Sequence, residues 1–138
     1  MNGEPVILIG HGVDACEVSR IADLMQRHGR RFVERVYKPA ELAYAEGGRN
    51  TEQRLAARFA AKEAIFKALG TGWAQGIGWT DAEVTRTDAG QPGVSLTGRA
   101  LEVATRRGIS GWSLSLTHTS ELAIASAIAF GPAGGLGR

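Results

Sequence analysis

The stretch RFAAKEAIFKALG, residues 58–70, is rich in alanine, the residue with the highest helix propensity, and it ends in a glycine. At about 100° per residue, the apolar side chains of this region gather on one side of a helix. They are Leu55, Phe59, Phe66 and Leu69. Lys62 falls within the same arc, and Glu63 lies at its edge. The pattern predicts one long helix from Thr51 to about Leu69, with Gly70 as its stop.

A lysine inside an apolar stripe has two interpretations. In the first, Lys62 extends its stem over apolar surface towards water, and Glu63 pairs with Lys67 one turn later. In the second, Lys62 and Glu63 are directed into a site. Helical spacing favours the first interpretation, because such charge pairs are common on helices.

Working outward from this helix, the remaining pattern predicts an α+β fold with a mostly antiparallel sheet packed on the long helix. A glycine-broken apolar run, Val6–Val13, predicts a buried strand that ends at Asp14. The other expected helices cover Glu17–Gly29, Arg31–Tyr37, Pro39–Ala45 and Thr97–Arg107. The other expected strands cover Asp81–Thr87, Val94–Leu96, Trp112–Thr117 and Leu122–Phe130, the last two as a hairpin.

Length and composition are those of one ordinary globular domain. The chain has 138 residues, of which 43% are hydrophobic and 22% charged. We expect one domain over residues 1–130 and a disordered tail over 131–138. No apolar run has the length of a membrane span, and Cys16 is the only cysteine. These features predict a cytoplasmic protein without a disulfide or a membrane partner.

Positive charge is concentrated near the N-terminus, although the net charge is only +2. Five arginines crowd into residues 20–35: Arg20, Arg27, Arg30, Arg31 and Arg35. They indicate either a docking surface for an acidic partner or a solvated basic face. The weak net charge and the lack of aromatic residues interleaved among these arginines argue against a nucleic-acid partner.

Asp14 also has two interpretations. A carboxylate at the end of a strand, together with a second one from another element, suits Mg²⁺ when water and phosphate complete the coordination shell. Alternatively, Asp14 caps the helix that begins near Cys16. Composition does not separate the two.

Three motifs in order resemble the small bacterial holo-acyl-carrier-protein synthases, a type of 4′-phosphopantetheinyl transferase. The first is Gly12-Val13-Asp14 with Glu17 and Arg20; the second is Phe59, Lys62, Glu63, Ala64 and Lys67; the third is Ser115-Leu116-Thr117-His118 followed by the strand Leu122–Ala129. The resemblance runs from about Val6 to Phe130. His11 departs from it, because the family usually has an apolar residue there. It is either a core histidine with a satisfied hydrogen bond or a second polar group near the metal.

The resemblance implies that 4′-phosphopantetheine moves from coenzyme A to a serine of apo-acyl carrier protein, releasing adenosine 3′,5′-bisphosphate. It implies that Asp14 and Glu63 are catalytic and hold Mg²⁺ against the pyrophosphate. Lys62 would reach the same phosphate or assist removal of the serine proton. The general base stays open between Lys62, Glu63 and a metal-bound water, and Lys67 would contact a phosphate or pair with Glu63.

The resemblance also assigns residues that bind coenzyme A. The loop Gly70-Thr71-Gly72 would lie against coenzyme A, where free backbone amides of a glycine-rich turn suit phosphate. For Gly70 alone, a helix C-cap is the alternative. Thr117 and His118 would lie near the 3′-phosphate or the base, unless His118 makes only a structural bond at a strand end.

Partners and assembly follow from the same resemblance. Arg20, Arg27 and Arg31 match positions that dock the acidic helix of acyl carrier protein, where charge attraction raises the association rate. The expected assembly is a homotrimer with active sites at subunit interfaces. Fatty-acid synthesis is the default pathway, and a specialised carrier is the alternative. A rival function is a non-catalytic coenzyme A-binding module of the same fold.

Overall fold

The computed structural model describes residues 4–72 and 74–135. The elements in chain order are β1 (Val6–Glu17), α1 (Val18–His28), α2 (Arg30–Val36), α3 (Pro39–Glu46), α4 (Thr51–Leu69), β2 (Ala82–Arg86), β3 (Pro92–Leu96), α5 (Gly98–Arg106), β4 (Gly111–His118) and β5 (Leu122–Pro132). Two short 3₁₀ turns cover Trp79–Asp81 and Ala133–Gly135. The long helix has the predicted bounds.

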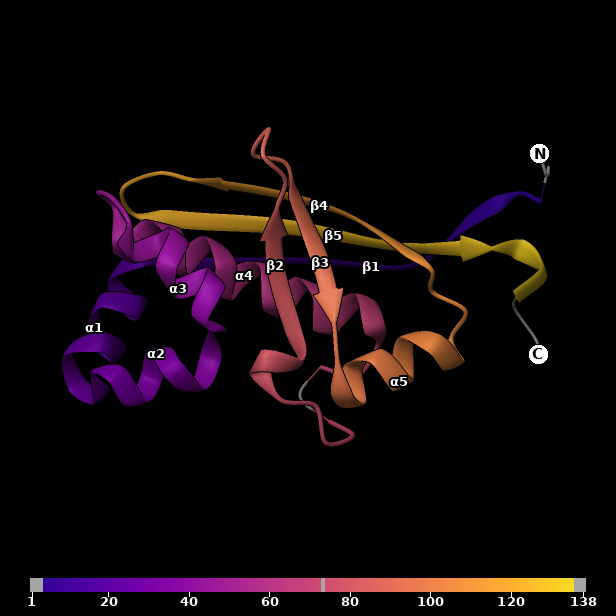
Figure 1. Ribbon diagram of the computed structural model, residues 1–138, viewed down its shortest axis with the longest axis horizontal. Helices are drawn as coiled ribbons and strands as arrows, with labels where there is room; N and C mark the ends of the chain where they lie inside the picture. Colours follow the sequence, from indigo (N-terminus) through magenta and orange to yellow (C-terminus); the bar gives the residue numbers. More distant parts are fainter. Residues whose placement is uncertain (1–3, 73, 136–138) are drawn as a thin grey trace.

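All of the strand pairing among these elements is antiparallel. One sheet has the order β1-β5-β4, and β2 and β3 form a separate two-stranded sheet. Figure 1 shows the three-stranded sheet along the long axis of the molecule, with β2 and β3 crossing it and α4 in the middle. The predicted α+β class and the predicted β4–β5 hairpin are confirmed. No helix among the described residues is both long and apolar enough to span a bilayer.

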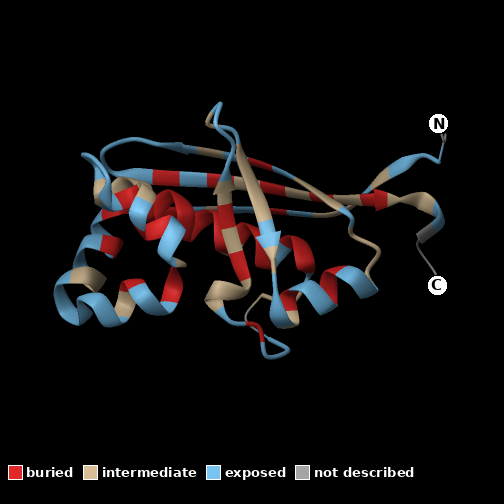
Figure 2. Cartoon of the chain, viewed as in Figure 1, coloured by how far each residue is buried: buried red, intermediate tan, exposed pale blue. Residues whose placement is uncertain are grey.

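Helix α4 forms the centre of the core. Its side chains are buried on most sides, from Leu55 through Leu69, and Figure 2 shows it as a nearly continuous buried segment. The sheet covers it with small residues of β5, which alternate with outward-facing ones. The inward residues are Ala123, Ala125, Ala127 and Ala129. Alanines on the helix and on the strand allow the two backbones to come close.

Strand β1 approaches α4 even more closely, through two glycines. A β-carbon at Gly10 would lie 2.0 Å from the carbonyl oxygen of Ala68, and one at Gly12 would lie 2.0 Å from that of Ala64. The prediction of a buried strand was wrong, because β1 is an edge strand whose burial alternates from Gly12 to Cys16. Gly10 and Gly12 occur here because the backbone of β1 packs against the backbone of α4. A run of apolar residues and glycines in the sequence looks the same whether a strand is fully buried or packs in this way.

The chain end differs from the expected tail. Strand β5 continues past Phe130 to Pro132, and the amide of Ala133 donates to the carbonyl of Pro5 over 2.9 Å. The amide of Gly134 donates to a carboxylate oxygen of Glu4 over 2.8 Å. The rest of the expected tail, 136–138, lies outside the described residues.

Candidate active site

Asp14, Glu63 and Lys67 meet where β1 crosses α4. The Lys67 ammonium donates to Asp14 Oδ1 over 3.0 Å and to the carbonyl oxygen of Val13 over 3.0 Å. The Glu63 carboxyl lies close enough to Asp14 for that carboxylate to help raise the pKa of Glu63. Glu63 and Lys67 are one turn apart on α4, and Asp14 comes from the strand that Gly12 holds against that turn.

This geometry excludes the cap alternative for Asp14 and shows which carboxylate Lys67 contacts. Asp14 lies in β1, and α1 begins four residues later with Glu17 at its N-cap position, so Asp14 does not cap that helix. Lys67 contacts Asp14 across the two elements, whereas the alternative paired it with Glu63 along the helix.

Two carboxylates close together make an acidic centre that lacks full charge compensation. Burial, together with the neighbouring carboxylate of Asp14, raises the pKa of Glu63 to about 7. Arg20 and Lys67 oppose this shift. Two oxygen donors from separate elements, open to a phosphate, fit a Mg²⁺ ion. Among the described residues, no group of three or more His, Cys, Asp or Glu side chains is placed to hold a metal, so substrate or water oxygens would complete the shell.

Lys62 does not join this centre, and the expectation that it is aimed into the site needs correction. Its side chain is fully buried, as an apolar stripe implies, but its ammonium lies 2.8 Å from Glu41 Oε1 on α3. The same ammonium donates to the carbonyls of Ala82 and Trp79. The helical spacing placed Lys62 away from water correctly. It could not show which neighbouring element the ammonium meets, because α4 is buried on most sides.

The Lys62–Glu41 ion pair is part of a closed polar network. Glu41 also accepts hydrogen bonds from the backbone amides of Lys38, at 2.9 Å, and Val84, at 3.0 Å. Burial lowers the pKa of Lys62, and the Glu41 carboxylate opposes that shift. The network joins α3, α4 and β2, and it satisfies charges that would otherwise be costly to bury.

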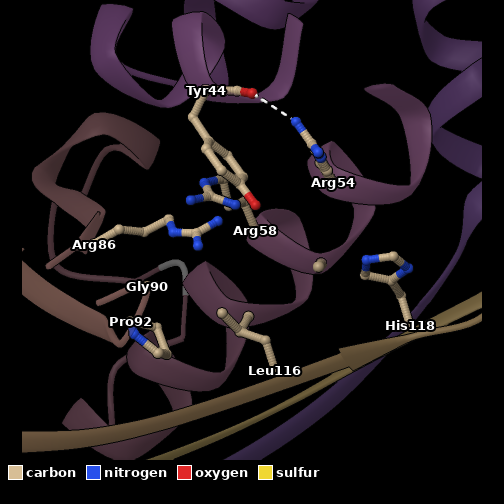
Figure 3. Close-up of a pocket in the computed structure, with 9 residues that line it drawn as sticks. Tyr44, Arg54, Arg58, Arg86, Gly90, Pro92, Leu116 and His118 are labelled. Atoms are coloured by element: carbon tan, nitrogen blue, oxygen red, sulfur yellow. Dashed lines mark hydrogen bonds between the residues drawn. The ribbon is translucent and has the colours of Figure 1, made fainter. Parts of the chain in front are cut away.

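On another side of α4, positively charged side chains surround a cavity of about 190 Å³ (Figure 3). The guanidinium groups of Arg54, Arg58 and Arg86 lie 4.7, 4.2 and 4.1 Å from the centre of the Tyr44 ring. His118 lines the same cavity from the end of β4. The pocket therefore concentrates positive charge where an anionic ligand can enter.

Arg58 is the most unusual of these residues. Only 4% of it is exposed, and its Nε is buried without a hydrogen-bond partner. Burial lowers the pKa of Arg58, and Glu41 opposes that shift. A buried guanidinium with an unused donor suits a phosphate or carboxylate of a ligand. Arg54, Arg58 and Arg86 were not among the predicted site residues. The sequence did hold one indication, because Arg58 stands between the apolar residues Ala57 and Phe59 of the predicted long helix.

The two residues predicted to bind the nucleotide lie on opposite faces of the sheet. His118 pairs with the buried Ala123, on the side of α4, and reaches the cavity. Thr117 pairs with Ile124, whose side chain is exposed on the other face. His11 lies on that other face too, with its Nε2 3.3 Å from Ser126 Oγ, whereas Asp14 pairs with the buried Ala125. His11 is therefore separated from the carboxylates by the sheet.

The loop after α4 ends the helix with its backbone amides. Gly70 has φ of 81°, and its amide donates to Lys67. The amides of Thr71 and Gly72 both donate to the carbonyl of Phe66, at 3.3 and 3.2 Å. The expectation of free amides in this turn was wrong, because these amides donate hydrogen bonds to carbonyl groups in the last turn of α4. The hydroxyl of Thr71 donates to the carbonyl of Gly72, and Gly70 and Thr71 line a shallow cavity with Arg106 and Arg107.

The arginines expected to dock a partner are exposed but differ in their contacts. Arg20 lies with its guanidinium 5.0 Å from the centre of the Phe59 ring and acts electrostatically on Glu63, so it borders the acidic centre. Arg27 pairs with Asp23 on α1 at 3.2 Å. Arg31 lines a surface cavity on α2 with His28, Phe32 and Arg35. Arg20 and Arg27 lie on α1 and Arg31 lies on α2, and these three arginines are called the basic surface below.

The fold and the site define a class of protein: an α+β domain with a two-carboxylate centre beside a lysine, and a separate arginine-lined pocket for an anion. The chain belongs to the 4′-phosphopantetheinyl transferase superfamily, whose family model matches residues 10–126. This confirms the resemblance that the three motifs indicated.

Individual relatives agree with this assignment. The holo-[acyl-carrier-protein] synthase of Solibacter usitatus is 45% identical over 122 residues, which are 88% of this chain and 98% of the relative. The crystal structure of holo-[acyl-carrier-protein] synthase from Neisseria meningitidis has a TM-score of 0.80 at 31% identity, covering 89% of this chain and 98% of that one. The Helicobacter pylori holo-[acyl-carrier-protein] synthase in complex with coenzyme A has a TM-score of 0.76 at 26% identity, covering 86% and 98%.

Proposed function

We propose that this protein is a holo-acyl-carrier-protein synthase, which transfers 4′-phosphopantetheine from coenzyme A to a serine of apo-acyl carrier protein. The observation that carries the proposal is the proximity of Asp14, Glu63 and Lys67 where β1 meets α4. Its relatives of known name are synthases of this kind, and one of them is a complex with coenzyme A.

In the reaction, the serine oxygen forms a bond to the phosphorus that carries pantetheine. The bond from that phosphorus to the oxygen of the adenosine phosphate breaks, and the serine proton passes to a base. Mg²⁺, when held by Asp14 and Glu63, supplies positive charge to the pyrophosphate. Lys67 is half-exposed beside Asp14, so its ammonium can turn to a phosphate oxygen and stabilise the charge that develops there. We infer that Lys67, rather than Lys62, is the lysine of this centre.

The arginine pocket is proposed to hold the nucleotide end of coenzyme A. Arg58 offers an unpaired buried donor, and Arg86 and His118 add positive charge around the same cavity. A 3′-phosphate has the charge and the acceptor oxygens that this set requires. Thr71 and the glycines beside it remain proposed contacts of the coenzyme through side-chain and van der Waals contact, since their amides cap α4.

The placement of the two half-sites supports a homotrimer with interfacial active sites. Arg58 and Glu63 are five residues apart on α4, which turns them about 140° away from each other. The pocket of one subunit and the carboxylates of a neighbour can then enclose one coenzyme A molecule. The sheet face opposite α4 offers an apolar surface for such an assembly, with Val13, Leu122 and Ile124 exposed.

Acyl carrier protein is proposed to dock on the basic surface of α1 and α2 through Arg20, Arg27 and Arg31. This surface leads to the acidic centre, so a serine delivered along it would reach the pyrophosphate. The free, buried thiol of Cys16 agrees with the proposal that the protein works in the reducing cytoplasm. We propose fatty-acid synthesis as the pathway served.

The test is the intact mass of apo-acyl carrier protein after incubation with the protein, coenzyme A and Mg²⁺. The expected result is a gain of one phosphopantetheine group, which is lost in Glu63→Gln and in the presence of a chelator. Binding of coenzyme A without transfer to any carrier protein would instead indicate a binding module.

A further inference from the structure

The buried Lys62–Glu41 network lies beside the arginine pocket on three of the elements that build it. Lys62 is one turn from Arg58 on α4, and Glu41 is one turn from Tyr44 on α3. Val84, whose amide donates to Glu41, is two residues from Arg86 on β2, so the two side chains share a face of the strand. One network residue and one pocket residue therefore come from each of three elements.

The contacts of the network hold these elements at a defined separation. Glu41 accepts from Lys62 and from Val84, and Lys62 donates in turn to the carbonyl of Ala82 on β2. Within the pocket, Arg54 donates to the carbonyl of Tyr44 over 3.0 Å, whereas the guanidinium groups of Arg58 and Arg86 lie against the ring of Tyr44.

The network also separates a negative charge from the pocket. Glu41 acts electrostatically on Arg58, which is itself buried and has an unused donor. With Lys62 present, the Glu41 carboxylate is neutralised by a contact of 2.8 Å. Without Lys62, the uncompensated Glu41 carboxylate would attract the buried guanidinium of Arg58 away from the pocket.

We propose that Lys62 is a positioning residue for the anion pocket: by neutralising Glu41 it keeps that buried carboxylate from attracting Arg58, so that Arg58 stays available for the ligand. This rests on the proposed function of the pocket as the site for the nucleotide end of coenzyme A. Lys62 itself touches neither the ligand nor the reacting atoms.

The test measures binding of adenosine 3′,5′-bisphosphate by titration calorimetry to the wild type, Lys62→Met, and the double variant Glu41→Gln with Lys62→Met. Lys62→Met leaves Glu41 without its partner, and we expect the dissociation constant to rise about tenfold or more. The double variant has no lone carboxylate, and its affinity should return to within about threefold of wild type. In synthase assays, Lys62→Met should raise KM for coenzyme A more than it lowers kcat.

Two controls separate positioning from general damage. Ile21→Ala removes buried apolar volume from α1, so at a similar loss of thermal stability it should leave the affinity unchanged. If Lys62→Met does not fold, Lys62→Gln applies the same test, because an amide can donate to the carbonyl of Ala82 but carries no charge.

The outcomes distinguish this inference from the function on which it rests. Wild-type affinity in Lys62→Met, or an equal loss in the single and the double variant, would overturn the positioning role while Arg58→Gln still abolished binding. Absence of binding by the wild type, or unchanged binding by Arg58→Gln, would overturn the assignment of the pocket and this inference with it.

Discussion

Gly12 lies against the carbonyl oxygen of Ala64 so closely that a β-carbon at residue 12 would be only 2.0 Å from that oxygen. This contact joins the strand that carries Asp14 to the turn of α4 that carries Glu63 and Lys67. The separation of Asp14 from Glu63 and Lys67 is thus set by backbone packing two residues away from Asp14.

Gly12→Ala is therefore expected to move β1 away from α4 and to separate Asp14 from Lys67. Overpacking of this kind typically costs about 1–3 kcal/mol of stability. We expect transfer activity to fall at least tenfold at a temperature where the variant is fully folded. Gly76→Ala, at a position with open space around it but positive φ, serves as a control that strains the backbone outside the carboxylate centre and the docking surface. Equal activity losses in the two variants would contradict the positional argument.

Lys67→Ala should reduce kcat by about 10²-fold or more, because it removes a cation placed to stabilise charge on a phosphate oxygen. Lys67→Arg keeps the charge and should retain a larger part of the activity. Single-turnover assays with saturating coenzyme A and acyl carrier protein would measure both variants. A loss confined to KM for coenzyme A would show that Lys67 contributes to binding alone.

The raised pKa of Glu63 predicts how stability depends on pH. A carboxyl whose pKa rises from 4.5 to about 7 on folding binds its proton more tightly in the folded state. Its contribution to stability is complete below pH 4.5 and is lost as pH rises through 7. In the presence of a chelator, the Tm of the wild type relative to Glu63→Gln should therefore fall across this interval. A Tm difference that does not change with pH would refute the shift.

Metal addition extends the same experiment. Mg²⁺ requires the ionised carboxylate, so it should stabilise the wild type more at pH 8 than at pH 5.5. Below pH 7 its binding should release a proton, which calorimetry in two buffers of different ionisation enthalpy would detect. Glu63→Gln should show neither effect.

The basic surface predicts a rate effect that depends on salt. Replacing Arg27 and Arg31 by glutamate should raise KM for acyl carrier protein about tenfold or more at low salt, with little change in kcat, because attraction to an acidic partner is lost. Arg106→Glu on α5 makes half of this change of charge elsewhere and should have a small effect on KM for acyl carrier protein. The difference between the variants should shrink at high ionic strength.

Ile124→Lys should disrupt the proposed trimer by placing a charge on the apolar face of the sheet. Ile124 is 40% exposed, so the substitution costs the isolated fold little. Light scattering should report a trimer for the wild type and smaller species for the variant. Transfer activity should fall with the trimer if the two half-sites come from different subunits. A monomeric wild type with full activity would contradict the interfacial arrangement.

Much of the architecture followed from the sequence alone, for local reasons. An alanine-rich stretch ended by a glycine predicted α4 with its correct bounds, since helix propensity and a positive-φ stop act within a few residues. Alternation in the last two strands predicted their hairpin. The resemblance of the motifs to a known family also pointed to Asp14 and Glu63, which the fold brings close together.

Which partner each charged side chain meets was decided by contacts between distant parts of the chain. Lys62 and Lys67 stand on the same helix, and their spacing does not say that Lys62 meets Glu41 while Lys67 meets Asp14. Helix α4 is buried on most sides, so no single apolar face orients it. The arginine pocket likewise draws on α3, α4, β2 and β4, which only long-range packing brings together. Local propensity determines where helices and strands form. The neighbours that give a charged side chain its role are determined only when these elements pack together.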